Sequence, residues 1–499
     1  MKKKASFIQT GLSQPTASID QRESRHGRRM NRFRLICRSA IVILTWSGFS
    51  ALGTVYNSDG IAASVQYLHD NFAQDGDTIT VPIGSFSWGQ NGVHITKAIT
   101  LQGAGVGTTN IMLSGHPVLN ITKNPSGIIR VRDITFLATG GAGTLPDPIL
   151  LDGAWPGGQP IIFYNVGVTL NGASLISCDI AGGAIFSHIT FNGQWNDFFI
   201  CVKDQTNTSS WTMVDSIGTH DTNGLLNIYI EDSTFTGGSN GIIDCDDNCR
   251  AVMRHNTFND SGGFNSHGKD SSTYGDRHFE IYENQFLLPD QTCTNGNQSL
   301  SNVNQYIWIR GGTGVVFNNN YQHLFTQCWG LKPEIKISIR GAEDDRPQGT
   351  CGQVAYPVPH QCGQNNNGSN DFTDPIWFWG NTGTTVSVFG GWVWGNPCGF
   401  DWNTFWQWGR DGQNTSLPLP IVLPPVGGLV SALGGTAKPG YTAYTYPHPQ
   451  VTGGSPSPTP TPTPTATPIP SPTPTVSPTP TPAPTATPTH RAPKRHPHS

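Results

Sequence analysis

The chain has 499 residues, of which 12% are charged, and its 59 glycines and 38 prolines argue against a mainly helical protein. The formal net charge of −4 is unevenly distributed, because residues 54–454 hold 16 Lys/Arg against 31 Asp/Glu, a net −15, while both ends are basic. So acidic a body argues against nucleic acid as a partner, and it is long enough to bury a large core.

The amino-terminal end has the pattern of an export signal. Four arginines precede an apolar run over 40–52, and they are Arg28, Arg29, Arg32 and Arg34. This pattern predicts a signal peptide over 1–53, cleaved after Gly53, and Met30 offers a second start. An uncleaved anchor is the alternative. With the leader removed we expect no membrane span and a secreted, extracellular or cell-surface protein.

One helix is expected, followed by strands. The apolar residues Ile61, Val65, Leu68 and Phe72 have the spacing of one helix face, which predicts a helix over 61–72. The segments 75–88 (DGDTITVPIGSFSW) and 95–105 (ITKAITLQGAG) then indicate strands broken at glycines. No second long helical pattern follows, so we expect this helix to cap the open end of a stack of strands.

A repeated segment indicates a solenoid. Each copy alternates apolar positions and carries an aromatic at or near its end: VRDITF (131–136), FSHITF (186–191), YIEDSTF (229–235), VMRHNTF (252–258), EIYENQF (280–286) and VFNNNYQ (316–322). The aromatics Phe235, Phe258, Phe286 and Tyr321 recur 23, 28 and 35 residues apart. A constant chemistry at variable spacing is typical of coils that stack on one another, with insertions in the turns.

Asparagines recur at one phase of this repeat. Asn256, Asn284 and Asn319 each stand two residues before the aromatic position. Asparagine tolerates left-handed backbone at a turn and can bond its neighbour in the next coil. We therefore expect a stacked asparagine ladder, the alternative being ordinary turn composition.

These features together resemble secreted bacterial proteins of the pectate-lyase-like superfamily. The resemblance rests on the helix and strands over 61–105, the NTF and NQF strands, YIWIRGGTGVVFNNN (306–320) and GYTAYTYPHP (440–449). It implies an all-β fold, a right-handed parallel β-helix over 54–454 with an N-terminal capping helix. It also implies a polysaccharide as partner, and a capped solenoid is expected to be a monomer.

A second strand series precedes the first in each coil and carries the candidate site. Its segments are IIDCDDN (242–248), FNSHGKD (264–270), YIWIRGGT (306–313) and IKISIRGAE (335–343). Because successive coils lie about 4.8 Å apart, side chains of several coils can converge in one groove. Stacking brings together Asp246, Asp247, His267, Lys269, Arg310 and Arg340.

The first functional hypothesis is a polyuronate lyase. β-Elimination needs a neutralised C6 carboxylate and a base for the C5 proton. Asp244, Asp246 and Asp247 are candidate ligands of Ca²⁺. Arg310 and Lys269 are candidate bases, and His267 and Asp247 complete the candidate catalytic set. Arg340 and Arg277 are candidate substrate-binding residues.

Two alternatives remain open. An inverting hydrolase of the polygalacturonase type would use DTNG (221–224), CDDN (245–248) and SHG (266–268). A non-catalytic carbohydrate-binding or surface structural protein would have the same fold. The tryptophans over 377–408 could stack on sugars, but we expect them to fill the core where the solenoid ends.

The cysteines and the tail complete the prediction. Nine cysteines follow the leader, and the local pairs Cys245–Cys249 and Cys351–Cys362 are plausible disulfides, with at least one cysteine left over. Residues 455–499 hold 16 of the 38 prolines alternating with Thr, Ser and Ala, which predicts a disordered, extended linker or stalk.

Overall fold

The structure is a computed structural model, and all the residues that it describes lie in one compact unit, Leu52–Ser499. It describes residues 53–138, 147–171, 174–193, 197–202, 221–237, 241–246, 248–268, 275–288, 306–323, 335–338, 362–366, 370–384, 386–389, 406–415, 428–430 and 434–451. The predicted leader, apart from Gly53, and the predicted tail lie outside these residues. The domain boundaries predicted for them are therefore untested.

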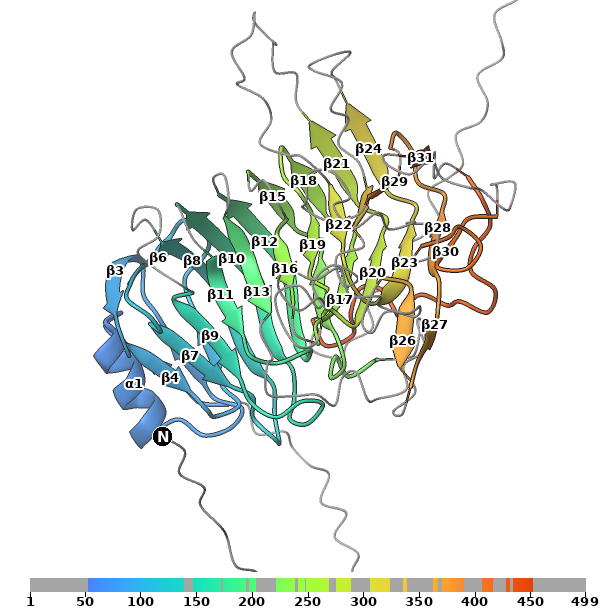
Figure 1. Ribbon diagram of the computed structural model, residues 1–499. Helices are drawn as coiled ribbons and strands as arrows, with labels where there is room; N and C mark the ends of the chain where they lie inside the picture. The colour runs from blue at the N-terminus through green and yellow to red at the C-terminus, as the bar shows by residue number, and fades with distance from the viewer. Residues whose placement is uncertain are drawn as a thin grey trace, which may run out of the picture. The chain divides into compact units, whose positions relative to one another are not determined.

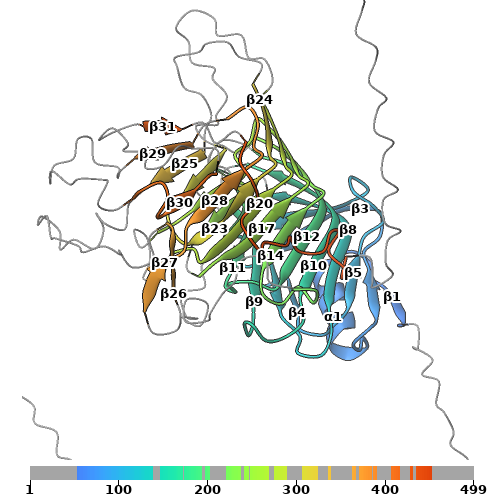
Figure 2. The same cartoon turned by 90° about the vertical axis from the view of Figure 1, so that its right-hand side faces the viewer.

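Two long sheets run along the described unit (Figures 1 and 2). The second strand series forms the 11-stranded sheet, whose strands pair in chain order and in parallel up to β29. Its strands are β4 (Val93–Ile95), β7 (Leu119–Thr122), β9 (Ile149–Asp152), β11 (Ser174–Cys178), β13 (Phe198–Val202), β16 (Ile243–Cys245), β19 (Phe264–Ser266), β22 (Ile307–Ile309), β25 (Ile335–Ser338), β29 (Val386–Phe389) and β31 (Gly428–Val430).

The first strand series forms the 18-stranded sheet, which is parallel throughout the described pairings. Its strands are β1 (Val55–Asn57), β2 (Thr78–Thr80), β3 (Gly84–Gly89), β5 (Thr100–Gln102), β6 (Thr109–Ser114), β8 (Ile129–Ala138), β10 (Ile161–Leu170), β12 (Ala184–Asn192), β14 (Ile228–Glu231), β15 (Thr234–Thr236), β17 (Arg250–Arg254), β18 (Thr257–Asn259), β20 (His278–Tyr282), β21 (Gln285–Leu288), β23 (Thr313–Phe317), β24 (Asn320–His323), β28 (Ile376–Trp379) and β30 (Gly412–Gln413). A short antiparallel pair, β26 (Gln364–Asn366) and β27 (Asp371–Thr373), stands apart from both sheets. The parallel β-helix predicted from the sequence is confirmed, and it agrees with the superfamily resemblance.

The larger sheet bends at one position in each coil. The bend falls on non-glycine residues with φ between 51° and 59°, namely Asp133, Asn165, His188, Asp232, His255, Glu283 and Asn318. From β14 onward each bend separates two strands. The left-handed conformation thus lies one residue before the repeated asparagines, and not on the asparagines themselves as the sequence had suggested.

The repeated aromatics stack inside the solenoid. Ring centroids are 5.3 Å apart between Phe235 and Phe258, and 4.6 Å apart between Phe258 and Phe286. Tyr321 continues the stack 4.6 Å beyond Phe286, and all four side chains are buried. The spacing is that of successive strands in a sheet, so the stack fixes coil upon coil.

The predicted asparagine ladder is present and longer than expected. Asn284 donates from its backbone N–H and from Nδ2 to Asn319 Oδ1, at 3.1 and 2.9 Å. Its own Oδ1 accepts the same two bonds from Asn256, both at 3.0 Å, and Asn319 repeats the pattern on Asn381. Each Nδ2 also donates to a backbone carbonyl of the preceding coil. Buried turn donors are thereby satisfied by the neighbouring coil.

The predicted capping helix is α1 (Ala62–Asn71), which packs against the first coil at β2, β3 and β4. Val65 and His69 are buried, and Leu68 is partly buried against the core. Ile61 and Phe72, which the pattern placed on the buried face, lie outside the helix ends and are 51% and 46% exposed. The buried face of α1 is therefore shorter than the apolar pattern in the sequence predicted.

We expect Asn284→Ala to destabilise the fold by about 3 kcal/mol or more, because it leaves the two Asn256 donors without an acceptor in a dry interior. Asn320→Ala is the matched control, since Asn320 is only partly buried and bonds Gln285 at the surface. Urea unfolding measures both variants. Equal stability of the two would contradict a structural role for the ladder.

Candidate functional site

Outward-facing residues of the 11-stranded sheet form a row across successive coils. Strand register pairs Asp244 with Asn265, Asn265 with Trp308, and Trp308 with Lys336. Residues on either side of each point inward and are buried, because side chains alternate along a strand. The row therefore lies on the outside of the sheet.

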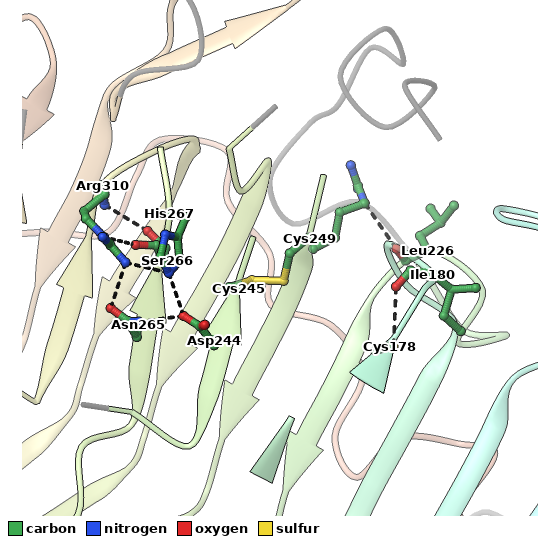
Figure 3. Close-up of a disulfide and its surroundings, with 11 residues drawn as sticks. Cys178, Ile180, Leu226, Asp244, Cys245, Cys249, Asn265, Ser266, His267 and Arg310 are labelled. Atoms are coloured by element: carbon green, nitrogen blue, oxygen red, sulfur yellow. Dashed lines mark hydrogen bonds and ion pairs between the residues drawn. A yellow bond between two sulfur atoms is a disulfide. The ribbon is translucent and has the colours of Figure 1, made fainter. Parts of the chain in front are cut away.

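Three predicted site residues meet at one end of this row (Figure 3). His267 Nε2 lies 2.9 Å from Asp244 Oδ1 and 2.7 Å from Nη2 of Arg310. Asn265 Nδ2 also donates to Asp244 Oδ1, at 2.6 Å. The side chains of His267 and Asp244 are 17% and 19% exposed, so both are partly accessible.

The guanidinium of Arg310 is held from several sides. Its Nε donates to the carbonyl of Ser266, its backbone N–H donates to Ser266 Oγ at 2.8 Å, and its Cζ lies 4.5 Å from the centre of the Trp308 ring. Only 3% of the residue is exposed. Arg310 is thus placed to act on its neighbours through its charge.

The proton on His267 decides which neighbour it bonds. Arginine can only donate, so Nε2 must carry a lone pair to accept from Arg310 and a proton to donate to Asp244. The neutral ring with Nε2 unprotonated bonds Arg310, and the protonated ring bonds Asp244. Nε2 of His267 thus lies between one acceptor, Asp244, and one donor, Arg310.

The electrostatics of Asp244 favour its ionised form. Burial alone would raise its pKa, but the charge of His267 and its hydrogen bond, with Arg310 and Asn265 beside them, hold the pKa below the ordinary 3.8. Asp244 is therefore a carboxylate at neutral pH.

The described contacts of Asp244 are those of a hydrogen-bonded carboxylate. Its Oδ1 contacts Asn265 Nδ2 and His267 Nε2, with the Arg310 guanidinium nearby, whereas a calcium ion takes six to eight oxygen ligands. Within the described ranges no group of three or more His, Cys, Asp or Glu side chains could hold a metal. The predicted ligand set also includes Asp247, which lies outside these ranges.

The other predicted site residues are distributed as follows. Asp246 directly follows β16, and by strand register it lies beside His267 of the next coil. Arg277 is fully buried, and its Nη2 donates to Asn365 Oδ1. Asp247, Lys269 and Arg340 lie outside the described residues. Of the predicted set, the structure thus brings together Asp244, His267 and Arg310.

Three members of the row were not singled out from the sequence. Asn265, Trp308 and Lys336 occupy the outward positions of β19, β22 and β25. They stand within segments already recognised as strands, and strict alternation along those strands would have identified them.

One predicted disulfide is present and another is not. Cys245 and Cys249 are bonded, which ties the end of β16 to the start of β17. Cys362 is a free, buried cysteine. The predicted pairing of Cys362 with Cys351 was therefore wrong.

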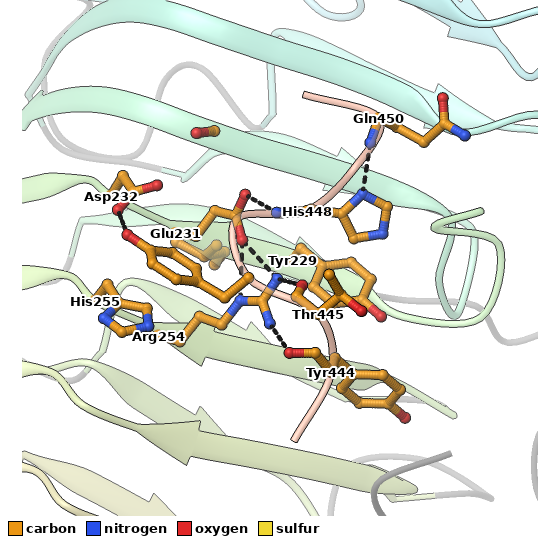
Figure 4. Close-up of polar contacts among 12 residues, drawn as sticks. Tyr229, Glu231, Asp232, Arg254, His255, Tyr444, Thr445, His448 and Gln450 are labelled. Carbon is orange, nitrogen blue, oxygen red and sulfur yellow. Dashed lines mark hydrogen bonds and ion pairs between the residues drawn. The ribbon is translucent and has the colours of Figure 1, made fainter. Parts of the chain in front are cut away.

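A second polar cluster lies on the outer face of the 18-stranded sheet, beneath the segment 440–451, here called the strap. Figure 2 shows the strap crossing this sheet, and Figure 4 shows the contacts beneath it. Arg254 and Glu231 form a fully buried ion pair at 2.8 Å, and Arg254 also donates to the carbonyls of Tyr444 and Thr445 at 2.8 Å. At the far end Arg130 donates to the carbonyl of Gln450.

The pair is charged because each partner satisfies the other. Burial alone would lower the pKa of Arg254, but the adjacent Glu231 carboxylate and the Tyr282 hydroxyl raise it above its ordinary value. Glu231 also accepts the backbone N–H of His448 at 3.0 Å. The strap thus completes a buried ionic network, which excludes the outer face of these coils as an open site.

His448 is neutral in this network. Its Nε2 donates to the carbonyl of Asp221 at 3.1 Å, and its Nδ1 accepts the N–H of Gln450 at 3.3 Å. Burial lowers its pKa from 6.5 to about 4, with Arg254 adding to the effect and Asp221 opposing it. A second proton on the ring, at Nδ1, would point at the backbone N–H of Gln450, which is itself a donor.

Asp221, an acid in one of the motifs of the hydrolase hypothesis, has a structural role in this part of the fold. The Asp221 carboxylate is buried and accepts bonds from the N–H groups of Leu225 and Leu226 and from the Tyr229 hydroxyl, at 2.9, 3.0 and 3.1 Å. It therefore organises the turn over 221–227 beneath the strap. It is not on the sheet that carries Asp244.

The described tryptophans of 377–408 lie mostly in packed surroundings. Trp406 and Trp408 are buried in the core, and Trp379 is buried between Phe317 and Tyr441 of the strap. This agrees with the prediction that they fill the end of the solenoid. Trp392, Trp394 and Trp402 lie outside the described residues.

Comparison with known proteins finds likeness of structure only. No protein-family model matches the chain, and no curated protein matches its sequence. An alginate lyase from Paenibacillus sp. shares 15% identity at a TM-score of 0.30, covering 57% of this chain and 93% of that one. A pectin methylesterase from carrot shares 14% identity at a TM-score of 0.29, covering 52% and 89%.

A second alginate lyase, solved as a complex, shares 14% identity at a TM-score of 0.31 and covers 67% of this chain and 75% of that one. By name these proteins are two alginate lyases and a pectin methylesterase. At these values the likeness carries no information on the activity of this chain. No helix in the described part of the chain is long and apolar enough to cross a membrane.

The depressed pKa of Asp244 predicts a pH-dependent cost for its removal. The carboxylate contributes stability above the ordinary carboxyl pKa, and this contribution is lost as pH falls through the folded value below 3.8. We expect Asp244→Asn to cost about 2 kcal/mol at neutral pH, and the gap to wild type to narrow in acid. Urea unfolding at several pH values measures the gap, and a gap independent of pH would contradict the charged cluster.

The lowered pKa of His448 predicts acid destabilisation. Below pH 6.5 this histidine binds a proton in the unfolded chain, whereas in the folded chain it does so only near pH 4. The free energy of unfolding is therefore highest above pH 6.5 and falls as the pH drops toward 4. The expected loss is about 3 kcal/mol, and His448→Gln should reduce it. His188→Gln, an exposed histidine, is the control. The same loss in His448→Gln as in wild type would refute this origin.

Proposed function

We propose that this protein is a secreted enzyme that cleaves an acidic polysaccharide by β-elimination, as polyuronate lyases do. The observation that carries the proposal is the convergence of Asp244, His267 and Arg310 from three successive coils at the outer face of one sheet. A partly exposed histidine between a carboxylate and a guanidinium is suited to proton transfer.

His267 is the base in this proposal. With Nε2 unprotonated it removes the C5 proton of a uronate, a double bond forms between C4 and C5, and the C4–O bond breaks. The proton passes to the leaving oxygen, which returns His267 to its neutral state. Asp244 stabilises the protonated ring during this cycle, and its low pKa keeps it ionised throughout.

Positive charge along the row serves the substrate carboxylate. The body carries a net −15, which repels a polyanion unless cations lie at the site. Arg310 supplies such a charge beside His267, and Lys336 lies on the next coil in register with Trp308. Arg310 is buried, so it acts through its field and by holding His267.

Calcium at Asp244, Asp246 and Asp247 is an additional proposal that the reaction described here does not need. Asn265 and His267 already bond the Asp244 carboxylate. In the reaction proposed here, His267 therefore transfers the proton without the help of a metal ion. A chelator therefore distinguishes the two routes.

The test is incubation of the purified protein with polygalacturonate and with alginate, each with calcium and with a chelator. We expect an ultraviolet-absorbing unsaturated product, and at least a ~100-fold lower kcat for His267→Gln. His94→Gln, an exposed histidine on the same sheet, should keep full activity.

Other outcomes overturn the proposal in recognisable ways. New reducing ends without the absorbance would show a hydrolase. Retention on immobilised polysaccharide without either product would show a binding protein. Full activity of His267→Gln would remove His267 from the mechanism.

A further inference from the structure

Acidic side chains stand in line with His267 on the coils that precede it. Asp152 ends β9, and strand register places it beside Asp179, which directly follows β11. Asp246 takes the same position after β16, and His267 takes it after β19. The position between Asp179 and Asp246 belongs to Lys203, which lies outside the described residues.

These acids reach the solvent on the face that carries the candidate site. Asp179 is exposed, and Asp152 and Asp246 are partly exposed. Asp244 stands two residues before Asp246 and faces the same side of the sheet, because side chains alternate along a strand. Its low pKa keeps it ionised. The described part of the coils before His267 thus presents carboxylates along this face.

The coils that follow His267 carry the opposite charge. Nη2 of Arg310 lies 2.7 Å from His267 Nε2, and Lys336 stands partly exposed on β25, one coil beyond β22. The strands β22, β25 and β29 contain no Asp or Glu. Trp308 is in register with Lys336, and its partly exposed ring is held by Arg310, whose Cζ lies 4.5 Å from the ring centre. Among the described residues, the charge along this face therefore changes sign at His267.

Elimination has the same asymmetry. The sugar that loses its C5 proton must be a uronate, because its carboxylate shares the negative charge that develops at C5 and brings that charge to nearby cations. The sugar on the other side of the broken C4–O bond leaves with the oxygen, and it needs no carboxylate. A cationic surface is thus required on only one side of the base.

We propose that the substrate is a polysaccharide in which a uronate alternates with a neutral sugar. The uronate lies over β22 and β25, with its carboxylate toward Arg310 and Lys336, and the neutral sugar lies over β16 beside Asp246. Because the bond that breaks is on C4 of the uronate, the reducing end of the polymer points toward β25. This inference rests on the proposed lyase activity, and it names the substrate class of the same site.

A polymer made of uronates alone fits this face less well. It places a carboxylate over β16, next to Asp244 and Asp246, and further carboxylates over the coils of Asp152 and Asp179. Like charges at such short range repel each other, and the low salt dependence of partly buried groups preserves the effect. The expected cost is about tenfold in kcat/KM.

The unsaturated product, measured by its ultraviolet absorbance, tests the proposal on four polymers. Rhamnogalacturonan and hyaluronan alternate an O4-linked uronate with an uncharged sugar, whereas polygalacturonate and alginate contain uronates alone. We expect kcat/KM on one of the alternating polymers to be at least ~10-fold higher than on either of the others. Equal or faster cleavage of the polymers made of uronates alone overturns this inference and leaves the proposed elimination standing. Absence of the product from all four overturns the elimination, and this inference with it.

A charge variant tests the same asymmetry within one protein. Asp179→Asn removes an exposed carboxylate three coils from His267, so it should raise kcat/KM about threefold on polygalacturonate and by less on the alternating polymer. Glu283→Gln is the control, because Glu283 is an exposed acid on the other sheet and should change neither value. An equal gain on both polymers, or no gain on polygalacturonate, would contradict the proposed role of the acidic coils.

Discussion

The structure depends on one constraint, which is that no coil can satisfy its own backbone or bury its own inner face. Every inward side chain and every turn donor must find its partner in the coil before or after. The asparagine ladder shows the constraint at its sharpest, because each Oδ1 accepts two bonds from the coil below. The turns can differ in length from coil to coil, but the asparagines that form these bonds must stand at the same position in every coil.

That fixed rung also determines where chemistry can be built. Asp244, Asn265 and Trp308 are far apart in sequence, yet their register makes them neighbours on one face. Slipping one strand by a residue would turn its outward side chain into the core. The strand pairing that holds the interior together therefore also positions the residues of the candidate site. The sheet fixes the geometry of that site.

Much of this could be predicted from the sequence, and the misses have physical reasons. Periodic features were predictable: both strand series, the aromatic stack and the asparagine ladder recur at one phase. Isolated features were harder. Apolar spacing placed Ile61 and Phe72 on a helix face, but the helix spans Ala62–Asn71 and these two residues are its caps. The contacts of the strap with Glu231 and Arg254 have no local signal, because they join residues about two hundred positions apart.

The strap has a consequence for how the chain reaches its folded form. A solenoid ordinarily gains stability coil by coil, since each coil meets only its neighbours. Here Tyr229, Tyr282 and Phe317 present an aromatic outer face that stays uncovered until the strap arrives. Coils made early in synthesis stay uncovered until residues 440–451 are made, so a chain that ends before 440 would leave this aromatic face exposed to water. The strap contacts Arg130, Glu231 and Arg254 on different coils, so it ties together coils that otherwise meet only their neighbours.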